Sequence, residues 1–147
     1  MKTHILVANA SEAKLYETER LGEKMDLINE YSHPASREKR LELVTDRPGH
    51  FATKGTGVSR GAYDESDPKE VEADKFAQQL AKIVIEICDN HHDDKMVIVA
   101  APHFHGLLNK HYDEQAKEQI THAIEKDYTK MPMKKLMGYL GELTKLT

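Results

Sequence analysis

The feature that most constrains the fold is a continuous run of apolar residues, Met96–Ala101, which ends at Pro102. The run lacks the alternation of polar and apolar residues that a strand with one solvent-facing side shows. A strand without alternation is typical of the centre of a parallel sheet whose two faces are both covered by helices. The run therefore predicts an α/β domain.

The segments before this run predict antiparallel strands. His4–Asn9, Ala13–Thr18 and Met25–Tyr31 are short and β-prone, with turn residues around Ala10 and Gly22 between them. Connections this short exclude a parallel crossover, which needs about a dozen residues or more. We therefore expect the three segments to form an antiparallel meander.

Three helices are expected after the meander. Asp67-Pro68, followed by Glu70, predicts a helix start with a capping box. This helix extends to about Cys88, and its apolar positions recur every three or four residues at Ala73, Phe76, Ala77, Leu80, Ile83, Val84, Ile87 and Cys88. A second helical stripe consists of Phe104, Leu107, Leu108 and His111. Pro132 opens a last helix, whose inward positions are Met133, Leu136, Met137, Leu140 and Leu143.

The segment Gln119–Glu125 has two interpretations: it either continues the second helix or forms a fifth strand, and the strand is favoured. The resulting order is βββαβαβα. This order predicts a ribonuclease H-like, three-layer α/β domain with a mixed five-stranded sheet, in which an antiparallel meander is followed by two parallel strands. Because the inference is topological, it implies no activity.

Length and charge limit the class of protein. The 147 residues suit one domain, 1–147, and the only cysteine, Cys88, is expected in the core rather than in a disulfide. No stretch approaches the ~18 apolar residues of a membrane span. The early run Ile5–Ala8 is too short for a secretory signal, so a cytoplasmic location is expected. The net charge of -4 argues against DNA as a partner, and a homo-oligomer is left open.

A long irregular segment, from about 32 to 67, is punctuated by glycine and proline. Structureless segments longer than ~12–15 residues are uncommon in compact domains, and they usually carry a function or lack order. From Arg37 to Arg60, six basic residues stand against three acidic ones. Basic side chains suit phosphate or another anion, and glycines allow close approach. The candidate anion- or RNA-binding residues are Arg47, Lys54, Gly55, Gly57, Arg60 and Gly61. The alternative is a surface loop with incidental charges.

No catalytic residue, metal or cofactor is predicted. A metal-dependent nuclease on this layout needs carboxylates that converge at the strand ends, and His4–Asn9 and Met96–Ala101 contain none. His103, His105 and His111 are candidate imidazole ligands, but solvated or capping roles are favoured for them. The chain also lacks the Gly-x-Ser-x-Gly sequence of a nucleophile elbow and the ending of a phosphate-binding P-loop.

Short motifs spread over nearly the whole chain point to a known family. They are Ile5–Glu17 (ILVANASEAKLYE), Asp46–His50 (DRPGH), Asp67-Pro68 with Phe76–Ala81 (FAQQLA), Val97–Pro102 (VIVAAP) with Phe104-x-Gly106-x-Leu108, and Lys126-Asp127 with Thr129. In order and spacing these motifs resemble the bacterial host attachment protein family. The resemblance implies a role in attachment to host cells. It also implies a fold like the middle domain of archaeal and eukaryotic class-1 translation release factors, itself ribonuclease H-like.

Three functions follow from this resemblance. The favoured one is a non-enzymatic cytosolic binding protein, associated with RNA or the ribosome, that affects attachment indirectly. The first alternative is a release-factor-like hydrolase of ester or RNA-linked substrates that acts through the glycine-rich basic loop. Here Gly55-Thr56-Gly57 lies where release factors carry Gly-Gly-Gln, and the glutamine is missing. The second alternative is a direct surface adhesion factor.

Overall fold

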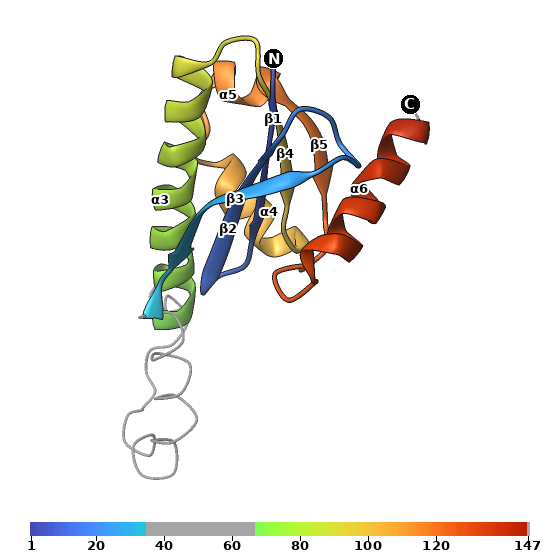
Figure 1. Cartoon of the computed structure of the whole chain (residues 1–147). Helices are drawn as coiled ribbons and strands as arrows, with labels where there is room; N and C mark the ends of the chain where they lie inside the picture. The colour runs from blue at the N-terminus through green and yellow to red at the C-terminus, as the bar shows by residue number, and fades with distance from the viewer. Residues whose placement is uncertain (35–66, 147) are drawn as a thin grey trace, which may run out of the picture.

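Strand β1 (Thr3–Ala8) lies at the centre of a five-stranded sheet with the order β3-β2-β1-β4-β5 (Figure 1). The computed structural model describes residues 1–34 and 67–146, with side chains as far as residue 143. On one side of β1, β2 (Glu12–Thr18) and β3 (Met25–Ser32) pair antiparallel in sequence order. The predicted meander is therefore confirmed.

On the other side of β1, the pairing is parallel. β4 (Lys95–Val99) pairs with β1, and β5 (Ile120–Ile124) pairs with β4. The segment with two interpretations, Gln119–Glu125, thus supplies the fifth strand, as favoured. The mixed five-stranded sheet is confirmed.

Helices cover both faces of the sheet (Figure 1). α3 (Pro68–Asn90), α4 (Pro102–Asn109) and α5 (Glu114–Gln119) lie on one face, and α6 (Met133–Leu146) lies on the other. Within the described residues, no helix is both long and apolar enough to cross a bilayer.

The larger core lies between the sheet and α3, α4 and α5. Alternate residues of the central strands, such as Leu6 and Ile98, pack there against the apolar stripe of α3. Cys88 belongs to this core and is 1% exposed, and burial raises the pKa of its thiol to about 11. The prediction that Cys88 is a core residue is confirmed.

The second core lies under α6. The intervening strand residues, among them Ile5, Val97 and Ile124, pack against Leu136 and Leu140 of that helix. Both helix residues were predicted to face inward. Because β1 and β4 are covered on both faces, their apolar runs show no alternation.

Helix α5 was not predicted. The sequence pattern predicts a single helix between β4 and β5, whereas the structure has two, α4 and α5. α5 has six residues, of which only Ala116 is buried, so it has no apolar stripe. It starts where the Asp113 carboxylate accepts a hydrogen bond from the Ala116 N–H at 2.8 Å.

Candidate functional site

The parallel pairing brings several chain ends to one edge of the sheet, which we call the carboxyl edge. β1, β4 and β5 all end there, and antiparallel β3 ends beside the start of β2. α3 and α4 also begin at this edge (Figure 1). Open α/β sheets bind their ligands outside the carboxyl ends of their strands. This edge is therefore where a ligand site is expected.

Asn9, the residue after β1, joins two loops of the carboxyl edge. Its Oδ1 accepts hydrogen bonds from the backbone N–H groups of Ser11 (2.8 Å) and Glu12 (2.9 Å). Its Nδ2 donates to Asp127 Oδ2 (3.3 Å) and Thr129 Oγ1 (3.1 Å). One amide therefore shapes the β1–β2 turn and also holds the loop between β5 and α6.

Asp127 is the anionic centre of this cluster. Its Oδ1 accepts from the backbone N–H of Thr129 (3.1 Å) and from the Thr129 hydroxyl (2.7 Å). Partial burial raises the pKa of Asp127, but the hydrogen bonds from Thr129 and Asn9 outweigh that effect and hold the pKa below its ordinary value. The carboxylate is thus kept ionised as an acceptor.

Two lysines cross-link the same loops. Lys130 Nζ lies 2.7 Å from Glu12 Oε2, and Lys14 Nζ donates to the Thr129 carbonyl at 3.2 Å. The β1–β2 turn and the β5–α6 loop therefore form one hydrogen-bonded unit, which we call the polar platform: Asn9, Glu12, Lys14, Asp127, Thr129 and Lys130.

His33 lies where the chain leaves β3. Its backbone N–H donates to the Ser11 carbonyl (2.8 Å), its Nε2 lies 2.9 Å from Glu72 Oε1, and its ring stacks on Phe76 at 5.4 Å. The hydrogen bond from His33 lowers the pKa of Glu72. Glu72 and Phe76 belong to α3, so the two flanks of segment 35–66 meet at the carboxyl edge.

The acidic residues at the start of α3 face histidines. Asp67 caps the helix as predicted, by accepting from the Lys69 N–H at 2.9 Å. Glu70, expected to complete a capping box, instead lies with both carboxylate oxygens 2.9 and 3.0 Å from His103 Nε2. One turn later, Asp74 Oδ1 lies 2.9 Å from His111 Nε2.

The three candidate imidazole ligands are not brought together. His103 and His111 pair with Glu70 and Asp74, respectively, while the buried His105 donates from Nε2 to the Ile124 carbonyl at 3.0 Å. In residues 1–34 and 67–146, no group of three or more His, Cys, Asp or Glu side chains is placed to hold a metal ion.

The predicted anion-binding residues lie outside the described residues: Arg47, Lys54, Gly55, Gly57, Arg60 and Gly61. The structure describes the residues that flank their segment: His33 contacts Glu72, and Asp67 caps α3. Sequence reasoning missed the polar platform. A signal was present, because Asn9 and Asp127 both follow strands at the edge where ligands bind.

The described carboxylates of this edge hold neighbouring loops and helices together. The carboxylates of Glu12, Glu70, Glu72 and Asp127 are each hydrogen-bonded to a lysine, histidine, threonine or asparagine side chain. Each of these hydrogen bonds fixes the orientation of its carboxylate. The loops of this edge are therefore cross-linked close to His33 and Asp67, the described residues that flank segment 35–66.

Comparison with known sequences adds one match. A sequence model of the family described as "Protein required for attachment to host cells" matches residues 4–140. The matched range includes the polar platform, all of β1 except Thr3, the other four strands and the start of α6. A search of curated proteins gave no match.

Proposed function

The chain belongs to the family of proteins required for attachment to host cells, and from that premise we propose that it is a non-enzymatic binding protein that recognises an anionic partner. The partner we propose is structured RNA, free or in the ribosome. The contacts are made by segment 35–66, with Lys54, Arg60 and Arg47 as the phosphate ligands and the glycines allowing approach. In this proposal the protein acts in the cytoplasm and affects attachment indirectly.

One observation carries the proposal: the contact between His33 and Glu72. It holds both flanks of the segment at the carboxyl edge, beside loops that the polar platform cross-links. Six basic residues against three acidic ones between Arg37 and Arg60 give that stretch a net charge of +3, although the whole chain has -4. The positive charge is thus concentrated in a stretch whose attachment points are fixed.

The fold supports the same proposal. We propose that the sheet is ribonuclease H-like and similar to the middle domain of class-1 translation release factors, which acts on the ribosome. The support is the order β3-β2-β1-β4-β5, with an antiparallel meander followed by two parallel strands. The missing glutamine in Gly55-Thr56-Gly57 favours binding over peptidyl-tRNA hydrolysis.

The experiment is sedimentation of cell lysate through sucrose gradients at low and moderate salt, with the protein followed across the ribosomal fractions. We expect co-migration that salt releases, because phosphate contacts release counterions. The variant Lys54→Ala/Arg60→Ala should migrate at the top of the gradient with unchanged thermal stability. The matched control, Lys82→Ala/Lys117→Ala, removes two exposed lysines of α3 and α5 and should sediment like the wild type.

Two outcomes would reject this function. If the wild type stays at the top of the gradient at low salt, RNA is not the partner. If the Lys54/Arg60 variant and the Lys82/Lys117 control lose co-migration equally, the association is non-specific. Recovery of the wild type on the cell surface would instead support the direct adhesion alternative.

A further inference from the structure

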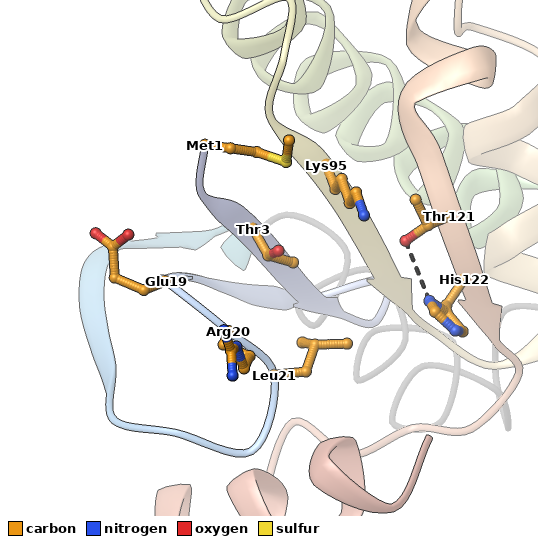
Figure 2. Close-up of a pocket in the computed structure, with 8 residues that line it drawn as sticks. All are labelled: Met1, Thr3, Glu19, Arg20, Leu21, Lys95, Thr121 and His122. Carbon is orange, nitrogen blue, oxygen red and sulfur yellow. Dashed lines mark hydrogen bonds between the residues drawn. The ribbon is translucent and has the colours of Figure 1, made fainter. Parts of the chain in front are cut away.

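A cavity of about 290 Å³ opens at the opposite edge of the sheet, where β1, β4 and β5 begin (Figure 2). Its walls come from the first residues of these strands and from the connection between β2 and β3. The residues that line it are Met1, Thr3, Glu19, Arg20, Leu21, Lys95, Thr121 and His122. We call it the amino-edge cavity.

The cavity is open because the first residues of β1 and β4 lie beyond the part of the sheet that α6 covers. Thr3 and Lys95 are direct neighbours across β1 and β4, and alternation places them on the same face as the residues under α6. The next pair on that face, Ile5 and Val97, is already in the core beneath α6. The first layer of side chains therefore projects beyond the core, with Leu21 closing the side toward α6.

Cations predominate in the lining. Arg20 and Lys95 carry positive charge, and Glu19 is the one acidic residue of the lining. In Figure 2 the Glu19 carboxylate is turned away from Lys95, Thr121 and His122. The Lys95 ammonium forms no hydrogen bond or ion pair with any described residue, and Arg20 makes only a 4.0 Å contact with Glu23 while 78% exposed.

Hydroxyl and imidazole groups complete the lining. The Thr121 hydroxyl lies 3.1 Å from His122 Nδ1 and 3.4 Å from the Met96 carbonyl, which orients the imidazole. Nε2 of the same ring makes no hydrogen bond within the described part of the chain. Thr3 adds a second hydroxyl from the neighbouring strand. Guanidinium, ammonium, imidazole and hydroxyl groups are the donors that bind phosphate oxygens in proteins.

We propose that the amino-edge cavity binds a small organic phosphate, a phosphomonoester. Arg20 and Lys95 neutralise the phosphate, and Thr3 and His122 Nε2 donate hydrogen bonds to it, while the Thr121 hydroxyl gives its single proton to His122 Nδ1 and so makes Nε2 the donor. The volume equals that of about ten water molecules, which is more than a bare phosphate fills. Leu21 and Met1 supply apolar wall for a short carbon chain. The residues that line the cavity all lie outside segment 35–66, and this proposal goes beyond the function proposed above.

The test is calorimetric titration of the full-length chain with glycerol 3-phosphate, with inorganic phosphate and with glycerol. We expect saturable binding of glycerol 3-phosphate, weaker binding of inorganic phosphate and none of glycerol. Lys95→Gln should weaken glycerol 3-phosphate binding roughly tenfold, because one charge-assisted contact is lost. The control Lys82→Gln removes an exposed lysine of α3 and should bind like the wild type.

A second variant, Thr121→Val, keeps the charge and removes one hydroxyl, and it should weaken binding severalfold. Each remaining outcome overturns the proposal. Absence of saturable binding, or equal losses in Lys95→Gln and Lys82→Gln, would show that the cavity is not a phosphate site. Equal affinity for inorganic phosphate and glycerol 3-phosphate would show that the organic part is not recognised.

Discussion

Gly22 in the β2–β3 turn and Gly141 in α6 face each other backbone to backbone. A Cβ atom built on Gly22 would lie 2.8 Å from the Cα of Gly141, and one built on Gly141 would lie 3.0 Å from the Cα of Gly22. Gly22 also has φ +92°, a left-handed conformation that side chains disfavour. The turn can therefore lie directly on the helix only because both residues lack a side chain.

Substitution of these glycines should reveal that contact. We expect Gly22→Ala to lower the free energy of unfolding by about 2–3 kcal/mol, because strain at positive φ adds to the clash. Gly141→Ala should cost about 1 kcal/mol, since helix propensity offsets part of its clash. The control is Gly138→Ala in the same helix, where the added Cβ meets nothing within 4 Å and should stabilise by up to ~1 kcal/mol. Urea unfolding measures all three; equal effects at 138 and 141 would contradict the contact.

The Tyr112 hydroxyl is buried without a hydrogen-bond partner among the described residues. Burial raises the pKa of Tyr112 well above its ordinary value of 10.0, so the hydroxyl stays protonated. Because an unsatisfied buried polar group costs free energy, Tyr112→Phe should raise the free energy of unfolding by about 1 kcal/mol. Thermal and urea unfolding would measure the gain. A loss of stability would mean that the hydroxyl has a partner in solution.

The hydrogen bond between Asn9 and Asp127 should survive an exchange of the amide and the carboxylate between the two positions. In Asn9→Asp the backbone hydrogen bonds within the turn can persist, but two carboxylates then face each other where a 3.3 Å hydrogen bond stood. We expect a loss of about 2 kcal/mol at pH 7. The double variant Asn9→Asp/Asp127→Asn restores one donor and one acceptor, and it should recover most of the lost free energy of unfolding. A double-mutant cycle by urea unfolding tests the coupling, and additive losses would argue against it.

Asp74 should contribute to acid sensitivity. The hydrogen bond from His111 and the nearby Lys110 hold the pKa of Asp74 below its ordinary value of 3.8. A lowered folded-state pKa stabilises the fold above the unfolded value, and this contribution is lost as pH falls through the lowered pKa. Asp74→Asn should therefore cost under about 1 kcal/mol at pH 7, because the pair is partly exposed, and nothing at the acid end.

Urea unfolding from pH 7 down to about pH 3 would measure this effect. The stability curve of Asp74→Asn should approach that of the wild type as the pH falls. Asp93→Asn, at an exposed residue with no ion pair inside the described ranges, is the control and should run parallel to the wild type. A constant difference between Asp74→Asn and the wild type would show that the His111 contact does not depend on the carboxylate charge.

The strands and the long helices were predictable because their apolar patterns are local. Met96–Ala101 indicates a strand covered on both faces, and the stripe from Ala73 to Cys88 indicates one buried helix face. α5 was not predicted, because a short helix with an N-cap and one buried alanine shows no apolar periodicity in the sequence. Patterning thus identified the elements that bury apolar surface and missed the one that buries little.

The candidate site was less predictable for a different reason. The partners Asn9 and Asp127 are 118 positions apart, and His33 and Glu72 are 39 apart, so no local pattern pairs them. Topology predicts that strand ends share an edge, but it does not say which side chains meet there. The charges of Lys54 and Arg60 were visible in the sequence, and their contribution to binding remains a prediction.

The contact between His33 and Glu72 also bears on how the chain between these two residues can vary. His33 and Glu72 are 39 positions apart in the chain, yet their side chains lie 2.9 Å apart, so the residue after β3 contacts the first turns of α3 directly. Closing a loop of twice the length costs only about 0.6 kcal/mol more. A change in the number of residues between His33 and Glu72 should therefore alter the free energy of unfolding little, as long as this contact is kept.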